Sequence, residues 1–164
     1  IVFSSVLIPS KNELWLFLKN KGTWFELENQ RRDFLPKVDK KEFREMKVVI
    51  SRNHCPPSLM AILERLSPLS IIGMGSVGYK VASILRGDAD LYISYSEPGK
   101  TTPKDWDMAA PAAIINGAGG YLTNEKGENL KFLESQEFEQ SEIMIASLNT
   151  NHQNICKNIN TFIP

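Results

Sequence analysis

The sequence has little of several features that would narrow its class. Its 164 residues include only two cysteines, Cys55 and Cys156, too few for a disulfide framework or a zinc site. Free thiols are typical of a reducing compartment, so we expect a cytoplasmic protein. No excess charge of either sign is present, because 19 Lys and Arg balance 19 Asp and Glu. We therefore expect no nucleic-acid polymer as a partner. No apolar run is long enough to span a membrane, so we do not expect a membrane as a partner.

What the chain does have is a first stretch of alternating apolar runs and turns. Strand-like segments at 1–8, 13–18 and 23–27 are separated by Pro-Ser-Lys-Asn and Asn-Lys-Gly turns, which predicts an antiparallel meander. Residues 28–46 are polar and charged and read as a connector with one short helix. We therefore divide the chain into a meander with its connector, 1–46, and a second part, 47–164.

The second part alternates strands and helices. Strands are predicted at 47–51, 69–72, 89–95, 121–123 and 143–146. One helix is opened by Pro56-Pro57, a second by the glycine-rich turn 73–78, and two more begin near 107 and 151. This order predicts a layered α/β arrangement around a largely buried sheet. Ligands of such sheets collect beyond the carboxyl ends of the strands, so the loops 51–54, 73–78 and 98–107 are the candidate site.

The stretch from Lys104 to Pro111 carries the first candidate residue, Asp107. Proline is tolerated in the first turn of a helix, so Pro111 predicts a helix that begins near Asp107. Capping that helix is the ordinary role for Asp107 and is favoured by this segment alone. A metal ligand is the other reading, since a carboxylate beside a helix N-terminus can hold a cation. Asp105 and Asp107 together are too few for a complete Mg²⁺ site.

The other two loops hold weaker candidates. Gly75-Ser76 before a helix offers backbone N–H groups to an anion, and Lys80 adds a charge. The plainer reading is a tight turn that needs glycine. His54 follows a strand in a polar Ser-Arg-Asn-His string and could bind phosphate or stack on a base, but an exposed loop histidine is the reading that this segment alone favours. His152, at the start of the last helix, is expected on the surface.

Several short motifs, taken together, resemble those of the inositol monophosphatase superfamily. The string Trp-Asp-Met-Ala-Ala-Pro at 106–111, followed by Gly119-Gly120, is similar to its C-terminal signature. Gly-Asp-Ala-Asp-Leu-Tyr at 87–92 resembles its Gly-x-Ala-Asp-x-Tyr strand, and 75–80 its Gly-Ser…Lys turn. The Ser-Arg-Asn-His string at 51–54 and the 98–107 loop look most like the 3'(2'),5'-bisphosphate nucleotidases within it.

The resemblance implies the layered αβαβα sugar-phosphatase fold, with this chain as its C-terminal part. It implies Mg²⁺ as cofactor, Asp107 as a metal ligand, and Ser51, His54, Ser76 and Lys80 as substrate-binding residues. Two departures are Asn53, where Ser is common, and the inserted residues 100–104. A larger one is that the family's Asp-Pro-Ile/Leu-Asp-Gly-Thr/Ser loop and catalytic Glu do not occur in 1–164. We therefore expect an N-terminal portion outside these residues, and no certain catalytic residue within them.

The resulting prediction is a phosphatase that converts 3'-phosphoadenosine 5'-phosphate to adenosine 5'-phosphate, with the 164 residues alone nearly inactive. An inositol or sugar phosphate is the alternative substrate. A non-catalytic module that kept the fold is the alternative of another class. The expected partner is a small-molecule nucleotide or sugar phosphate, and a homodimer is left open.

Overall fold

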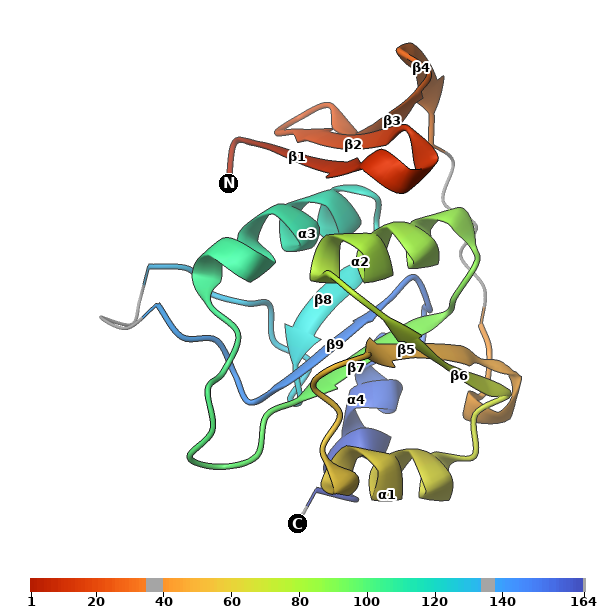
Figure 1. Ribbon diagram of the computed structural model, residues 1–164, viewed down its shortest axis with the longest axis vertical. Coiled ribbons are helices and arrows are strands. Elements are labelled where there is room, and N and C mark those ends of the chain that lie inside the picture. The colour runs from red at the N-terminus through yellow and green to blue at the C-terminus, as the bar shows by residue number, and fades with distance from the viewer. Residues whose placement is uncertain (35–39, 134–137, 164) are drawn as a thin grey trace.

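The computed structural model describes residues 1–34, 40–133 and 138–163. Four layers are stacked in it: a four-stranded sheet, a pair of helices, a five-stranded sheet and a second pair of helices (Figure 1). The layered α/β arrangement expected from the sequence is confirmed.

The first layer is an antiparallel meander in the order β1-β2-β3-β4. Its strands are β1 (Phe3–Ile8), β2 (Glu13–Leu18), β3 (Gly22–Leu27) and β4 (Gln30–Asp33), with a 3-10 turn, Pro9–Lys11, after β1. The prediction of a connector from residue 28 is wrong at its start, because β4 pairs with β3 there. A two-residue turn joins them, and both its residues, Glu28 and Asn29, have positive φ. Such hairpin turns usually carry glycine, so the Glu-Asn pair gave no turn signal.

The five-stranded sheet has the order β6-β5-β7-β9-β8. β5, β6 and β7 are parallel, and β9 runs antiparallel to both β7 and β8. Its strands are β5 (Lys47–Ser51), β6 (Ser70–Met74), β7 (Leu91–Tyr95), β8 (Tyr121–Asn124) and β9 (Ile143–Ser147). The helices are α1 (Pro57–Leu66), α2 (Val77–Arg86), α3 (Asp105–Gly117) and α4 (His152–Asn160), with a 3-10 turn at Phe43–Glu45.

Alternation along the strands of this sheet divides the core in two. On β5, Val49 belongs to the cluster under α2 and α3, whereas Val48 and Ile50 belong to the cluster under α1 and α4. Tyr92 and its neighbour Leu91 on β7 divide in the same way. Successive side chains of a strand point to opposite faces, so a sheet covered on both faces needs apolar residues at every position. The strands that lead into the loops 51–54 and 98–107 are therefore packed on both faces.

The upper sheet is held to the helix layer by close contacts. A Cβ on Gly117 of α3 would overlap the ring of Phe17 on β2, so only glycine allows this approach. The Thr23 hydroxyl of β3 donates to the Ile114 carbonyl at 2.7 Å, and Arg86 of α2 pairs with the buried Glu13 carboxylate of β2 at 2.6 Å. Within the described residues, no helix combines the length and apolarity needed to cross a bilayer.

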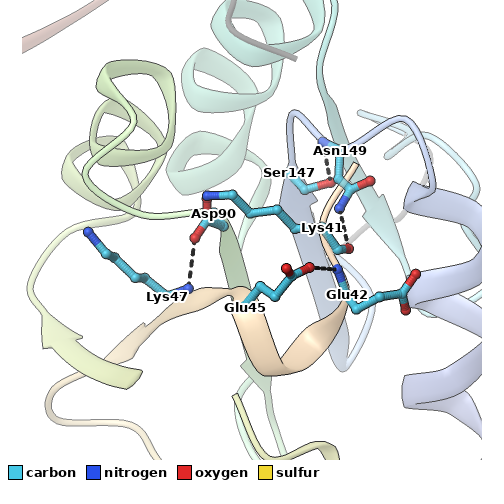
Figure 2. A network of polar contacts seen from close by, with 7 residues as sticks. All are labelled: Lys41, Glu42, Glu45, Lys47, Asp90, Ser147 and Asn149. Carbon is cyan, nitrogen blue, oxygen red and sulfur yellow. Dashed lines mark hydrogen bonds and ion pairs between the residues drawn. The ribbon is translucent and has the colours of Figure 1, made fainter. Parts of the chain in front are cut away.

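A closed polar network lies at the end of the sheet where β5 and β7 begin (Figure 2). The Asp90 carboxylate accepts the Lys47 backbone N–H at 2.8 Å and the Lys41 ammonium at 2.7 Å. Asn149 donates its amide to the Lys41 carbonyl at 2.9 Å, and its N–H donates to the Ser147 hydroxyl at 3.3 Å. The network ties the segment before β5 to the loop after β9. Asp90 is its central acceptor.

Candidate functional site

The three loops predicted to form the site line one cleft of about 990 Å³ at the carboxyl ends of β5, β6 and β7. Because the three strands are parallel, the loops that follow them emerge at one edge of the sheet. The five residues singled out from the sequence all line this cleft: Ser51, His54, Ser76, Lys80 and Asp107. The fold thus brings together side chains that are up to 56 positions apart in the chain (107 − 51).

Asp107 is exposed and occupies the third position of α3, which begins two residues earlier than predicted. Its carboxylate accepts the Lys104 backbone N–H at 3.3 Å. It therefore caps the helix from inside the first turn, and its expected place as the residue before the helix is wrong. The helix N-terminus also favours a negative charge here. The carboxylate remains open to the cleft while it caps.

Pro111 is the reason why the predicted start was late. It lies at the seventh position of α3, well inside the helix, where proline was not expected. A proline there has no N–H for the carbonyl four residues earlier, which belongs to Asp107. The Asp107 carbonyl therefore lacks the usual bond from the residue four positions later, at a point where the helix borders the cleft.

Asp105 opens α3 and is buried, unlike its neighbour Asp107. Its carboxylate accepts the Gln140 amide at 2.5 Å and the Leu133 N–H at 2.7 Å. Sequence reasoning placed it beside Asp107 as a paired carboxylate, and the two turn out to point into different surroundings. Its partners lie 28 and 35 positions away, so no local signal could have shown this role.

The Gly75-Ser76 turn leads from β6 into α2. Ser76 is the N-cap, and its hydroxyl accepts the Tyr79 N–H at 3.2 Å. The α2 N-terminus therefore borders the cleft with its dipole, which favours an anion there. A Cβ on Gly75 would meet nothing within 4 Å, so the turn keeps open space beside it.

Lys80 is 2% exposed, although it lines the cleft. Its ammonium donates to the Gly75 carbonyl at 2.6 Å and lies 5.1 Å from the centroid of the Tyr92 ring. Burial lowers the pKa of Lys80 to about 8. Among the described residues no carboxylate pairs with this ammonium. A buried cation without an anion is costly, and an anion in the cleft would reduce that cost.

Ser51 and His54 come from the end of β5 and the loop after it. Ser51 is half-buried and His54 is exposed. Both line the cleft, next to Cys55, whose thiol pKa is raised by burial. An exposed imidazole on the cleft wall is free to reorient toward a ligand.

The other histidine contradicts its prediction. His152 is 1% exposed, not a surface residue, and its two ring nitrogens lie 2.8 Å from the Ser147 and Thr123 hydroxyls. Tyr121 stacks on the ring at 4.8 Å. Burial lowers the pKa of His152 to about 4. Its partners come from β8 and β9, which a helix-start pattern could not reveal.

The described residues bring few candidate metal ligands together. No group of three or more His, Cys, Asp and Glu side chains in residues 1–34, 40–133 and 138–163 is placed to hold a metal ion. Asp107 fits one position of such a site and no more.

Comparison with characterised proteins gives partial matches to phosphatases. The Golgi-resident adenosine 3',5'-bisphosphate 3'-phosphatase of Mus musculus is 32% identical over 120 residues, which covers 69% of this chain and 32% of the relative. The 3'(2'),5'-bisphosphate nucleotidase 1 of Mus musculus is 26% identical over 101 residues, covering 62% and 32%. The matched region thus spans about a third of the length of these relatives.

Solved structures match over nearly the whole chain. Inositol monophosphatase II from Staphylococcus aureus has a TM-score of 0.70 at 18% identity, covering 99% of this chain and 55% of that one. A staphylococcal enzyme with bound 2'AMP has a TM-score of 0.71 at 17% identity, covering 99% and 56%. These likenesses show a shared fold. The profile of the inositol monophosphatase family matches residues 1–163, and the chain belongs to that family.

Proposed function

We propose that this chain forms the substrate-facing part of a Mg²⁺-dependent phosphatase that removes the 3'-phosphate of 3'-phosphoadenosine 5'-phosphate. The observation that carries the proposal is the convergence of a buried, unpaired ammonium, a helix N-terminus and an exposed carboxylate on one cleft. Relatives named for nucleotide 3'-phosphates support the substrate class.

The cleft residues divide into those that bind phosphate, those that contact the nucleotide and one that binds metal. Lys80 and the Ser76 end of α2 attract phosphate oxygens, because both present positive charge or N–H groups to the cleft. Ser51 and His54 contact the nucleotide from the β5 side. Asp107 supplies one ligand to the metal, with further carboxylates from outside the described residues. Bound Mg²⁺ in such phosphatases polarises the phosphate and activates water.

The first test separates substrate classes by binding, which needs no catalysis. Calorimetric titration of the 164-residue chain with adenosine 5'-phosphate and with inositol 1-phosphate should show the nucleotide bound more tightly. Lys80→Met should weaken both, because it removes the buried ammonium. Lys11→Met, an exposed lysine outside the cleft, is the matched control. Tighter binding of inositol 1-phosphate would favour an inositol or sugar phosphatase.

The second test concerns catalysis and the metal. The 164-residue chain should release almost no phosphate, because in this proposal Asp107 supplies only one of the Mg²⁺ ligands. An in-frame Asp-Pro-x-Asp-Gly motif upstream of Ile1 would allow a longer protein to be made, and Asp107→Asn should remove most of its Mg²⁺-dependent activity. Asn preserves the cap, so unchanged activity would assign Asp107 to capping alone. A start codon directly before Ile1 would favour the non-catalytic module.

A further inference from the structure

Two lysine side chains line the cleft, and they differ in burial and in origin. Lys80 comes from α2 and is 2% exposed, whereas Lys100 comes from the loop between β7 and α3 and is exposed. The proposed function gives Lys80 a phosphate to bind and gives Lys100 no role. Lys100 is also the first of the residues 100–104, by which this loop departs from the family's pattern.

A tight turn brings Lys100 to the cleft. Its N–H donates to the Glu97 carbonyl at 3.0 Å, which closes the four-residue turn Glu-Pro-Gly-Lys at 97–100. Pro98 supplies the fixed φ of the second position, and Gly99, at the third, has a φ of 77°. These are the features of a type II turn, whose third residue needs a positive φ. The local sequence therefore specifies the backbone conformation from which the Lys100 side chain extends.

The loop that carries this turn is fastened on both sides. On the β7 side, the Glu97 carboxylate accepts the hydroxyl of Ser58, in the first turn of α1, at 2.9 Å. On the α3 side, the Gln140 N–H donates to the Pro103 carbonyl at 2.9 Å. A side chain on backbone held in this way loses mainly its own rotamer freedom when it binds a ligand, because the loop is already ordered.

The carboxylates of the cleft do not neutralise its lysines. Glu97 is bound by Ser58, and Asp107 accepts the Lys104 N–H. Within residues 1–34, 40–133 and 138–163, Lys100 forms no ion pair with a carboxylate, and neither does Lys80. The cleft therefore presents two ammonium groups from different elements, and a ligand with two separate anionic groups would complement both.

We propose that Lys100 binds the second phosphate of the substrate and makes the cleft selective for bisphosphates over monophosphates. This inference rests on the proposed function and deepens it, because 3'-phosphoadenosine 5'-phosphate carries two phosphates. One phosphate binds Lys80 and the N-terminus of α2, and the other binds Lys100. The cleft of about 990 Å³ lies at the upper end of the range for small-molecule sites and has room for both.

The experiment compares adenosine 3',5'-bisphosphate with adenosine 5'-phosphate by calorimetric titration of the 164-residue chain, with a chelator present to prevent hydrolysis. The wild type should bind the bisphosphate about three- to thirtyfold more tightly, the range for one charge-assisted hydrogen bond that stays partly open to water. Lys100→Met should remove this preference and leave the affinities for adenosine 5'-phosphate and inositol 1-phosphate within about twofold of wild type. Lys100→Arg should keep the preference, since it keeps the charge.

Ionic strength gives a second readout. Salt screens an exposed ammonium much more than a buried one, so the preference for the bisphosphate should decrease in the wild type as salt is raised from about 0.05 M to about 0.5 M. In Lys100→Met the ratio of the two affinities should not change with salt. Lys11→Met, an exposed lysine outside the cleft, is the matched control and should behave as the wild type.

Three results would overturn the inference. They are a wild type that binds both nucleotides equally, a preference that survives in Lys100→Met, and a loss in Lys100→Met that is equal for the monophosphate and the bisphosphate. Circular dichroism of each variant checks that it is folded. If one of these results occurs while Lys80→Met still weakens binding, the proposed function stands; wild-type binding of neither nucleotide would overturn both.

Discussion

At the end of the five-stranded sheet where β5 and β7 begin, Asp90, Lys41, Ser147 and Asn149 bind one another (Figure 2). At the opposite end, polar side chains line a cleft, and Ser76, Lys80 and Asp107 there each bind a nearby backbone group. Each end also has one histidine: His152, buried against Ser147, and His54, exposed in the cleft. The same sheet thus supports one polar cluster that is satisfied internally and one that is left open to a ligand.

The comparison shows how to separate structural from functional polar residues. Buried polar groups need partners, and when the protein supplies all of them the cluster stabilises the fold. When it supplies only some, as for the buried ammonium of Lys80, the remaining interaction is available to a ligand. We therefore expect substitutions at the closed end to change unfolding, and substitutions at the open end to change binding.

The largest expected effect at the closed end is a loss of stability in acid caused by His152. Its pKa is about 4 in the folded chain and about 6.5 in an unfolded one, so the unfolded state binds the proton first as the pH falls. The stabilising contribution is complete above pH 6.5 and decreases as the pH falls toward 4. Between pH 7 and pH 5 it should decrease by about 2 kcal/mol.

Urea unfolding at the two pH values measures this. His152→Gln should remove that part of the pH dependence, whereas His54→Gln should leave it in place. An equal pH dependence in wild type and His152→Gln would mean that carboxylates, rather than this imidazole, control acid unfolding.

A smaller effect is expected from Asp90. Asp90→Ala removes the acceptor of the Lys47 N–H and the partner of Lys41, and should lower the free energy of unfolding by about 1–2 kcal/mol. The ion pair itself adds little, because both side chains are partly exposed. Asp88→Ala, two residues away and 51% exposed, is the control and should cost less than about 0.5 kcal/mol. Nucleotide binding should not change in either variant, and a weakened affinity in Asp90→Ala would contradict the division between the two ends.

Local patterns in the sequence predicted most of the elements. Apolar runs bounded by turn residues identified β1 to β3. Helical spacing of apolar residues identified α1, because those residues are the ones that the helix buries. The meeting of the three loops also followed from the strand–helix order, since parallel strands put their carboxyl ends at one edge. The roles given to Asp107, His54 and Ser76 came only from the resemblance to the family, because the local pattern favoured a plainer reading for each.

What could not be predicted depends on partners distant in the chain. His152 looked like a surface residue because its hydroxyl partners, Thr123 and Ser147, lie on β8 and β9. Asp105 differs from Asp107 because its carboxylate binds the distant Gln140. The Lys80 ammonium lies against the ring of Tyr92, which comes from β7. Residues 35–39, within the predicted connector, lie outside the described part.

The smallest effect is expected from titration of Lys80 at the open end. Its pKa of about 8 means that the ammonium is mostly protonated at pH 7 and mostly neutral at pH 9. If the charge attracts phosphate, the dissociation constant of adenosine 5'-phosphate should rise with pH over this range, by at most about tenfold, since the ammonium fraction falls by that factor. Lys80→Met should bind weakly and show no such rise. A pH dependence that persists in Lys80→Met would assign it to another group of the cleft, and a flat wild-type profile would mean that the ammonium only supports the Gly75 turn.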